Sequence, residues 1–467
     1  MNQKKELLKN TLIIGIGKFS SQIVIFLMLP LYTNFLQADQ YGMYDTLIAI
    51  AAFIIPFITL LLEESMFRFL IEYSNDSEKK KEVISTAVFY HIIGLLIFSV
   101  IYLVVALLFD FSFVSLFYFY IIVNVIHGLS NAIARGTSNI KLYSISNFFT
   151  NILIVILNIL TIAVLKLGVE GLFLSYILGN LITSIYVFFK INLKDYFCLK
   201  KINANMTKEM IRYSIPLVPN SISWNIINLS DRIMLTYMVS PNANGIYSVS
   251  NKFPQILGSI YNFFSTAWKE SASKSVGNEK YYSEIFNMIL RVLFIVTIGL
   301  LCALPLCYKI FVADEYFYSY YYVPILVIAM VFSNIAEFYS GIFIAYKETK
   351  IIGVTTVIAA VLNVIVNFLF IRKYGIIIAA MSTLISTITI SIIRKIKLKK
   401  YIYIEYKLSF IFKYSVLIGF SVIFFYLRKI IWNIIFDIII LFILFLDNKT
   451  YINKYINKLR GKKINDL

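Results

Sequence analysis

Charged residues are scarce in this chain. They make up 15% of its 467 residues, whereas hydrophobic residues make up 60%. A soluble globular domain carries about 25% charged and about 45–50% apolar residues. The mean hydropathy of +0.80 agrees with this imbalance. The composition therefore excludes a soluble globule and predicts a polytopic, all-α membrane protein.

Cysteine and histidine are rarer still. The chain has three cysteines, Cys198, Cys302 and Cys307, and two histidines, His91 and His127. Their spacing gives neither a disulfide framework nor a metal-ligand cluster. The histidines have no acidic neighbours in sequence, so we expect packed polar side chains. No glycine-rich nucleotide-binding loop is present, and we predict neither a resident cofactor nor an enzyme.

Long apolar runs are plentiful. Fourteen of them reach about 20 residues, the length that crosses a hydrocarbon core of ~30 Å. The first has no small-residue cleavage site, so we expect an uncleaved signal anchor. The last is short and carries Asp437, and twelve spans with a re-entrant or interfacial hairpin are the alternative. The runs lie near residues 11–36, 43–68, 83–109, 112–134, 142–165, 171–189, 213–239, 245–268, 284–308, 322–345, 351–371, 375–393, 408–427 and 430–446.

Basic residues are distributed unevenly between the two sides of these spans. About three quarters of the lysines and arginines fall in alternate loops on the side of the termini, and positive loops stay in the cytoplasm. We therefore predict a multi-pass protein of the cytoplasmic membrane with both termini inside. The net charge of +18 then reflects topology and contact with anionic lipid, and does not indicate nucleic-acid binding.

A weak internal repeat divides the chain. Residues 33–44 match residues 236–247 at the threonine, the glycine and the final tyrosine, and residues 166–169 echo residues 373–376. Two echoes at nearly the same offset indicate a duplication. We expect three parts: residues 1–200, an N-terminal six-helix lobe with a basic cytoplasmic linker from 190; residues 201–400, a C-terminal six-helix lobe; and residues 401–467, a helix pair with a basic cytoplasmic tail.

One set of residues resembles a known family. It comprises Asp231-Arg232, Leu235 and the stretch 245–252, with Pro30-Leu31-Tyr32 and Gln40-Tyr41-Gly42 in the first half. With these residues the chain resembles the Wzx-type polysaccharide flippases of the multidrug/oligosaccharidyl-lipid/polysaccharide (MOP) exporter superfamily. The resemblance implies two six-helix lobes that form a V around a central cavity, with two further C-terminal spans.

The same resemblance implies a function. A Wzx-type flippase moves an undecaprenyl-pyrophosphate-linked oligosaccharide repeat unit to the outer leaflet by alternating access, for an O antigen, a capsule or another surface polysaccharide. The implied partners are membrane lipids, a polysaccharide polymerase and glycosyltransferases, and we expect a monomer. Two alternatives stay open: a cation-coupled multidrug exporter of the same superfamily, and a membrane-embedded polysaccharide polymerase or ligase, which the short external loops disfavour.

Ionisable residues inside the predicted spans point to a cavity, because each costs about 2.5–3.5 kcal/mol to insert into lipid. Lys18 and Lys252 each lie roughly 10 Å inside a span. Their ammonium groups suit a pyrophosphate, although long lysine stems also reach the interface from this depth. We expect Asp45 to pair with a cation of the first half, and Glu337 to bind a proton or pair with a cavity lysine. The candidate substrate-binding residues are Lys18, Lys252, Arg291, Gln22, Glu337 and Asp45.

A second set of polar residues lies at a similar depth in the second half. Asp231, Asn363 and Thr383 each lie about eight residues from the outer end of a predicted span, and Asn367 is one turn from Asn363 on the same face. Hard oxygen ligands of this kind bind small cations. The pattern predicts a coupling-ion site for Na⁺, in preference to H⁺ because asparagine does not titrate. In the alternative, Asp231 pairs with Arg232 and the asparagines bond between helices.

Overall fold

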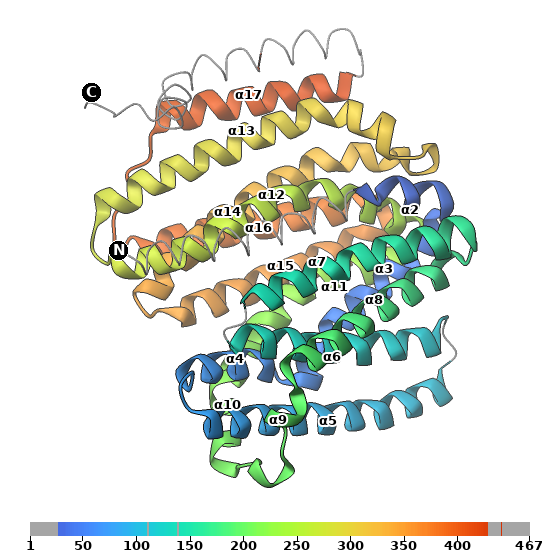
Figure 1. The fold of residues 1–467 in the computed structure, drawn as a ribbon. Coiled ribbons are helices and arrows are strands. Elements are labelled where there is room, and N and C mark those ends of the chain that lie inside the picture. Colours follow the sequence, from blue (N-terminus) through green and yellow to red (C-terminus); the bar gives the residue numbers. More distant parts are fainter. Residues whose placement is uncertain (1–26, 110–111, 138–139, 428–439, 441–467) are drawn as a thin grey trace, which may run out of the picture.

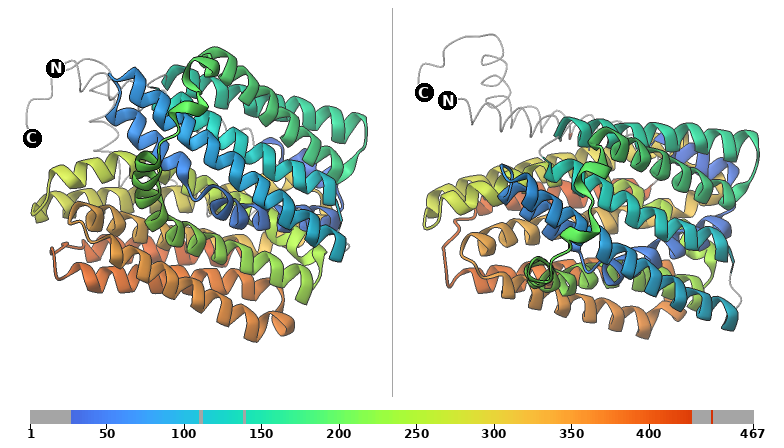
Figure 2. Two further views of the ribbon diagram at one scale, coloured as in Figure 1. Left: turned by 90° about the horizontal axis from the view of Figure 1, so that it is seen from below. Right: turned by 60° about the horizontal axis from the view of Figure 1, so that its bottom comes forward.

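The computed structural model describes residues 27–109, 112–137, 140–427 and 440. Within these ranges all regular secondary structure is helical, which confirms the predicted fold class. The helices run across Figure 1 in roughly parallel directions, and the turned views of Figure 2 preserve this alignment. Lys18, Gln22 and most of the first and last predicted spans lie outside the described residues.

The first half of the chain contains α2 (Leu29–Phe35), α3 (Ala38–Thr59), α4 (Leu62–Glu72), α5 (Ser77–Leu108), α6 (Val114–Gly136), α7 (Ile140–Asn158), the π-helical turn Ile159–Val164 and α8 (Gly168–Ile191). The predicted span 43–68 is wrong as one helix, because Leu60 and Leu61 have φ values of 51° and 54° and separate α3 from α4. There the Leu61 N–H donates to the Thr59 hydroxyl, at 3.1 Å. Hydropathy does not register so short a break.

The basic segment after α8 folds back onto the first half. It contains α9 (Leu193–Tyr196) and α10 (Ala204–Ser214). Met206 and Met210 of α10 are buried in one cluster with Leu62 and Met66 of α4. The predicted hydrophilic linker is therefore partly amphipathic, and its apolar side covers the α4 end of the bundle. The lobe boundary near residue 200 stays a prediction.

The second half contains α11 (Val218–Met238), α12 (Pro241–Lys274), α13 (Glu279–Phe311), α14 (Val323–Ala345), α15 (Thr349–Tyr374), α16 (Ile376–Leu398) and α17 (Leu408–Leu427). Helices α12 and α14 pack closely and share an aromatic core. The Trp268 and Phe338 rings are stacked with centroids 4.3 Å apart, and the indole N–H donates to the Phe338 carbonyl. In Figure 1, α13 and α17 lie together at one edge of the molecule.

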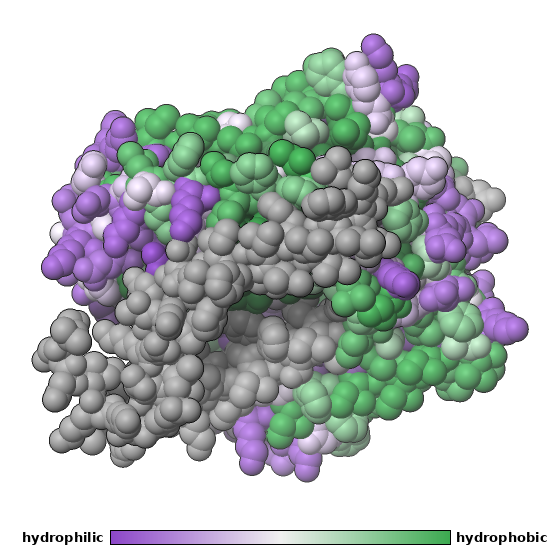
Figure 3. Space-filling view, turned by 90° about the horizontal axis from the view of Figure 1, so that it is seen from above, coloured by the Kyte–Doolittle hydropathy of each residue, from purple (hydrophilic) through white to green (hydrophobic). Residues whose placement is uncertain are grey.

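Ten helical segments of the described residues are long and apolar enough to cross a membrane. In Figure 3 the visible hydrophobic residues gather in a central band, and the hydrophilic ones lie toward the two ends. The chain is thus a multi-pass membrane protein. Helices α11 and α12 are long enough but not among the ten, because they carry polar residues along their length. The count of fourteen spans stays a prediction.

The two halves cross at a pair of glycines. A Cβ atom added to Gly42 of α3 would collide with the Pro241 carbonyl of α12, and one added to Gly245 would collide with the Ala38 carbonyl of α3. Gly42 corresponds to Gly245 in the internal repeat, and Ala38 to Pro241. The crossing is therefore reciprocal about a local pseudo-two-fold axis, and glycine is needed on both sides because the backbones touch.

Hydrogen bonds close the same crossing. The Thr46 and Thr236 hydroxyl oxygens lie 2.6 Å apart, and the Asn244 amide donates to the Gly42 carbonyl at 2.7 Å and to the Thr46 hydroxyl at 2.9 Å. Thr46, Thr236, Asn244 and Gly42 are all buried. The predicted orientation, with both termini in the cytoplasm, would place this crossing at the outer end of the helix bundle.

We predict that cysteines at positions 46 and 236 form a disulfide in membranes. The variant is Thr46→Cys with Thr236→Cys, made without the three native cysteines and with a protease site in the 190–212 segment. Because the native hydroxyls touch, oxidation with copper phenanthroline should keep the two cleaved halves together on a non-reducing gel. Each single variant is the control. If both thiols react with maleimide and no cross-link forms, the closed crossing is not the resting state.

Candidate functional site

A partly buried ion pair joins the two halves beside the glycine crossing. The Arg232 Nε atom of α11 lies 2.6 Å from Asp45 Oδ2 of α3, and both side chains are less than one fifth exposed. The Ser248 hydroxyl of α12 donates to the same oxygen at 2.5 Å. The expected partner of Asp45 in the first half is wrong for the described residues, because α3 packs against α11 and α12 and so turns Asp45 toward the second half.

Lys252 lies one turn beyond Ser248 on α12. Its Nζ atom is 6.0 Å from the centre of the Tyr41 ring, and its charge interacts with those of Asp45 and Arg232. Within the described residues it makes neither a hydrogen bond nor an ion pair. Arg232 and Lys252 thus both lie near Asp45 at this junction, and the charge of Asp231 acts on Arg232 as well.

The four residues of the predicted cation site meet at one carboxylate. Asp231 is 2% exposed. Its Oδ1 atom accepts hydrogen bonds from the Asn367 and Asn363 amides at 2.6 and 3.2 Å, and its Oδ2 atom accepts one from the Thr383 hydroxyl at 2.7 Å. Helices α11, α15 and α16 therefore converge on Asp231, as equal depth in three spans predicts. Of the predicted alternative, the Asp231–Arg232 pair is wrong, since Arg232 bonds Asp45. The asparagines do bond between helices, as that alternative also predicts.

Two further hydroxyls complete this cluster. Tyr247 of α12 donates to Asp231 Oδ2 at 2.7 Å, and Ser382 of α16 donates to Oδ1 at 3.4 Å. Sequence reasoning missed both, although Tyr247 belongs to the repeat and Ser382 precedes Thr383. The Asn367 carbonyl oxygen is buried beside the carboxylate and has no hydrogen-bond partner among the described residues. One carboxylate, amide oxygens and hydroxyls are the donor set of a Na⁺ site, so these residues fit the ion.

Glu337 of α14 lines a polar cavity. Its Oε1 atom is 2.7 Å from the ammonium of Lys269, a lysine toward the end of α12. Glu337 therefore pairs with a lysine, but Lys269 is not one of the residues that line the cavity. The cavity has a volume of about 480 Å³ and lies between α11, α12 and α14. Trp224, Tyr261 and Asn334 are among the residues that line it.

Sequence reasoning missed a buried arginine of α16 that lies close to Glu337. Arg394 is 0% exposed and donates to the hydroxyls of Thr355, Ser340 and Thr356 and to two carbonyls. It falls one residue beyond the predicted span 375–393, which made it look like a loop cation. Through these bonds the guanidinium joins α16 to α14 and α15. All of the acceptors are neutral groups.

Arg291 lies away from the junction of the two halves. The Arg291 guanidinium is 4.8 Å from the centre of the Phe410 ring of α17, in a groove between α13 and α17. The structure does not bring it to Asp45 or Lys252.

His91 of α5 has an acidic partner in the first half. Its side chain is 2% exposed, and its Nε2 atom lies 3.5 Å from Glu63. Glu63 lies in the first turn of α4, directly after the break. The fold therefore gives His91 the acidic neighbour that it lacks in sequence.

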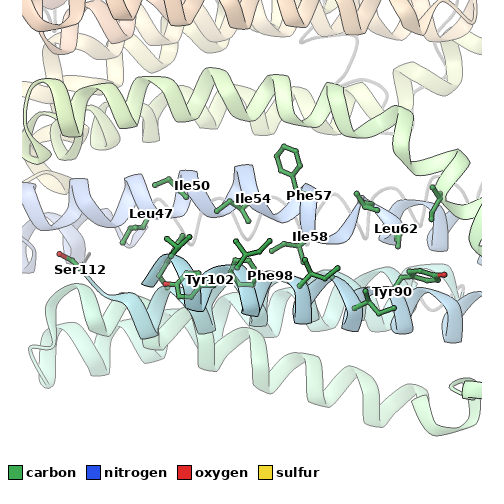
Figure 4. A pocket seen from close by; sticks show the side chains of 18 of the residues that line it. Leu47, Ile50, Ile54, Phe57, Ile58, Leu62, Tyr90, Phe98, Tyr102 and Ser112 are labelled. Carbon is green, nitrogen blue, oxygen red and sulfur yellow. The ribbon is translucent and has the colours of Figure 1, made fainter. Parts of the chain in front are cut away.

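An apolar groove runs along the outside of α3. It has a volume of about 890 Å³ and is lined mainly by aliphatic and aromatic side chains of α3 and α5. Figure 4 shows Leu47, Ile54 and Ile58 of α3 opposite Tyr102 and Phe98 of α5. It reaches from Ile211 of α10 to Tyr237 at the end of α11, so it follows most of the length of a membrane-spanning helix.

Two family models match the sequence. That of the polysaccharide biosynthesis protein family matches residues 7–268, more than half of the chain, and that of the MatE family matches residues 216–369. A relative in Methanocaldococcus jannaschii, an uncharacterized membrane protein, is 25% identical over 301 residues, which are 58% of this chain and 68% of the relative.

Solved structures of transporters share the fold. An inward-facing multidrug resistance MATE family transporter of the MOP superfamily has a TM-score of 0.69 at 13% identity and covers 83% of this chain and 98% of its own. The lipid II flippase MurJ in an inward closed conformation has a TM-score of 0.67 at 16% identity and covers 94% and 100%. A MOP superfamily transporter from Pyrococcus furiosus has a TM-score of 0.57 at 14% identity, covering 88% and 96%.

We predict that Na⁺ stabilises the protein through Asp231. Sodium chloride should raise the melting temperature of the purified chain more than choline chloride does, because a ligand that binds only the folded state stabilises it. Asp231→Asn keeps the shape of the carboxylate but removes its charge, and should abolish the difference. Asp45→Asn removes a buried carboxylate elsewhere and should retain it. An equal response of wild type and Asp231→Asn would reject the site.

Proposed function

We propose that this chain, which belongs to the polysaccharide biosynthesis protein family and has the fold of the MOP superfamily exporters, is a flippase for a lipid-linked oligosaccharide. The substrate is an undecaprenyl-pyrophosphate-linked repeat unit, moved across the cytoplasmic membrane for a surface polysaccharide. The observation that carries the proposal is the pair of basic groups where the two halves meet: Arg232 is bonded to Asp45, and Lys252 beside it makes neither a hydrogen bond nor an ion pair with the described residues.

The positive charge suits the pyrophosphate. A pyrophosphate diester carries about two negative charges, and a charged group in the bilayer must be paired as it crosses. Arg232 is already bonded to Asp45, whereas Lys252 is next to it and available, so Lys252 is the first contact that we assign. Lys18 stays a proposed second contact from the first half.

The apolar groove suits the lipid tail. Its wall is formed by α3, and the same helix carries Asp45 into the interior. A polyprenyl chain in the groove of Figure 4 would remain in an apolar environment while its headgroup enters between the halves. A cationic drug has no lipid tail to place in a groove that follows most of the length of a helix, which favours the flippase over the multidrug exporter.

The crossing of the halves supports alternating access. It is held by a few hydrogen bonds and one ion pair around Gly42 and Gly245, and these can be exchanged for water and for the substrate. In the predicted orientation the described conformation is closed on the outside. Opening there would require α3 to part from α11 and α12, which would separate Asp45 from Arg232 and leave both basic groups for the substrate.

The Asp231 cluster is the proposed coupling site. Asp231, Asn363, Asn367 and Thr383, with Tyr247 and Ser382, would hold Na⁺, which would supply one positive charge to the buried carboxylate. Asp231 and Arg232 are adjacent on α11, one facing the cluster and the other facing Asp45. A change in the position of α11 on ion binding would therefore act directly on the pair that holds the two halves together.

Deletion of the gene tests the function. We expect loss of a surface polysaccharide and accumulation of its lipid-linked repeat unit on the cytoplasmic leaflet, in a strain without a redundant flippase. Mass spectrometry of extracted lipids measures the accumulation, and uptake of ethidium tests the multidrug exporter. Unchanged surface glycan without accumulation would reject the flippase, and ethidium retention in the deletion strain would favour the exporter.

We predict that Lys252 acts through its charge. Lys252→Ala should lower transport at least tenfold at unchanged membrane abundance, and Lys252→Arg should restore part of it, because arginine keeps the charge but not the geometry. The same pair of variants tests Lys18. Lys274→Ala, which removes a lysine in the last turn of the same helix, is the control. Wild-type transport in Lys252→Ala would show that this lysine only reaches toward the interface.

A further inference from the structure

A histidine and a glutamate of the first half face each other in the protein interior, and the proposed function uses neither. The His91 side chain of α5 is 2% exposed, and that of Glu63 in the first turn of α4 is 20% exposed. Glu63 Oε2 lies 3.5 Å from His91 Nε2. Both atoms are shielded from solvent and have no hydrogen-bond partner among the described residues. A buried imidazole beside a carboxylate is a candidate proton-binding site.

The hydrogen bond on the other side of the imidazole shows where its first proton lies. His91 Nδ1 is 2.8 Å from the Ala87 carbonyl oxygen of the same helix. A carbonyl only accepts, so Nδ1 carries a proton and donates it. In a neutral imidazole Nε2 is then an acceptor, and it faces a carboxylate oxygen that is also an acceptor. One further proton, on Nε2 or on Glu63, turns this contact between two acceptors into a hydrogen bond.

The surroundings of the pair supply no other bond to it. The Thr59 hydroxyl donates to Glu63 Oε1 at 3.3 Å, which leaves Oε2 to His91. Between Asp45 and its last residue, α3 has no titratable side chain. Within the described residues, none of the titratable or charged side chains on the other elements packed here forms a hydrogen bond or an ion pair with Glu63 or His91. They include Tyr90 of α5, Glu64, Arg68 and Glu72 of α4, His127 and Arg135 of α6, Lys194, Asp195 and Tyr196 of α9, and Lys208, Glu209, Arg212 and Tyr213 of α10.

The pair lies directly after the break between α3 and α4. Leu60 and Leu61 both have positive φ values, which strain residues with a side chain and which cluster at functional sites. Just before the break, a Cβ atom added to Gly94 of α5 would lie 2.2 Å from the Ile58 carbonyl oxygen. The backbones of α3 and α5 are therefore in contact there. The break separates this backbone contact from Glu63, so α4 can pivot at the break while α3 stays against α5.

The apolar groove passes the same place. Ile58, Leu60 and Leu62 on either side of the break line it, together with Tyr90 of α5. Figure 4 shows Leu62 and Tyr90 at this end of the groove. The predicted orientation would place this end at the cytoplasmic leaflet. A separation of α4 from α5 would widen the groove here.

We propose that Glu63 and His91 bind one proton between them, and that this proton holds α4 against α5 at the end of the apolar groove. As the pH rises and the proton leaves, the two acceptors repel each other, and α4 moves away from α5 at the break. The proton site does not depend on the proposed function. Its consequence for a lipid tail rests on that function, because only a flippase would admit the tail through this end of the groove.

The imidazole can be observed directly, because the chain has only two histidines. Full-length protein labelled with ¹⁵N-histidine, in nanodiscs, gives NMR signals of His91 and His127 alone, and Glu63→Gln identifies those of His91. We expect Nδ1 to carry a proton at every pH. Nε2 should change from a hydrogen-bonded to a bare nitrogen between about pH 5 and about pH 9, the range in which imidazole groups titrate.

Glu63→Gln is the decisive variant, and Glu64→Gln is its matched control. A glutamine at position 63 has the size of glutamate, and its amide donates to Nε2 without an added proton. The Nε2 signal of this variant should therefore stay hydrogen-bonded at every pH. Glu64 lies in the same turn of α4 and is exposed, so Glu64→Gln should titrate as the wild type does.

The movement of α4 is measured by pulsed electron paramagnetic resonance. Nitroxides are attached at Ile71→Cys of α4 and Ile92→Cys of α5, both exposed positions, in a chain without the native cysteines. Raising the pH over the same range should lengthen the distance between them by several ångström. The distance should not change in the Glu63→Gln background and should change as in the wild type in the Glu64→Gln background.

The outcomes separate this proposal from the flippase. An Nε2 that is bare at acidic pH, or that does not change over the range, would overturn the proton site. A titrating Nε2 with a constant distance between the nitroxides would overturn its control of α4. If the signal and the distance respond as expected and the deletion strain accumulates no lipid-linked repeat unit, the proton site stands and the flippase is rejected.

Discussion

A charge inside a membrane-spanning bundle must have a partner, and this requirement positions the helices of the site. Asp45 brings α3 to α11 and α12 through Arg232 and Ser248, and Asp231 brings α11, α15 and α16 together through amides and hydroxyls. The two carboxylates lie on either side of α11. That helix is therefore held to both halves by polar contacts, where apolar packing alone would leave its rotation undetermined.

Depth along the spans contributed to the prediction of the Asp231 cluster. Asn363 and Asn367 share a helix face, and Asp231 and Thr383 lie at the same distance from the outer ends of their spans, so the four side chains could meet once α11, α15 and α16 packed together. The all-helical architecture followed from apolar runs in the same way. These predictions succeeded because helix geometry converts residue spacing into position, and membrane thickness aligns the helices with one another.

Partners from distant helices could not be predicted. Depth says nothing about which helices are neighbours, so the pairs Asp45–Arg232, Glu337–Lys269 and Glu63–His91 appear only in the structure. At the break, the Leu61 N–H donates to the Thr59 hydroxyl and not to a helix carbonyl. Arg394 was hidden by an uncertainty of one residue at a span boundary. In each case the deciding interaction is local and polar, whereas the sequence signal was an average over many apolar residues.

The pseudo-two-fold axis at the glycine crossing bears on the duplication itself. Asp45 and Ser248 are 203 residues apart, the offset of the repeat, so they occupy equivalent positions and meet across the axis. A half-length protein pairing with its own copy would carry the same residue on both sides. Two aspartates would then set like charges against each other in an apolar environment. Joining the halves in one chain permits an acid on one side and a hydroxyl on the other, so an asymmetric charge pair with Arg232 becomes available only after fusion.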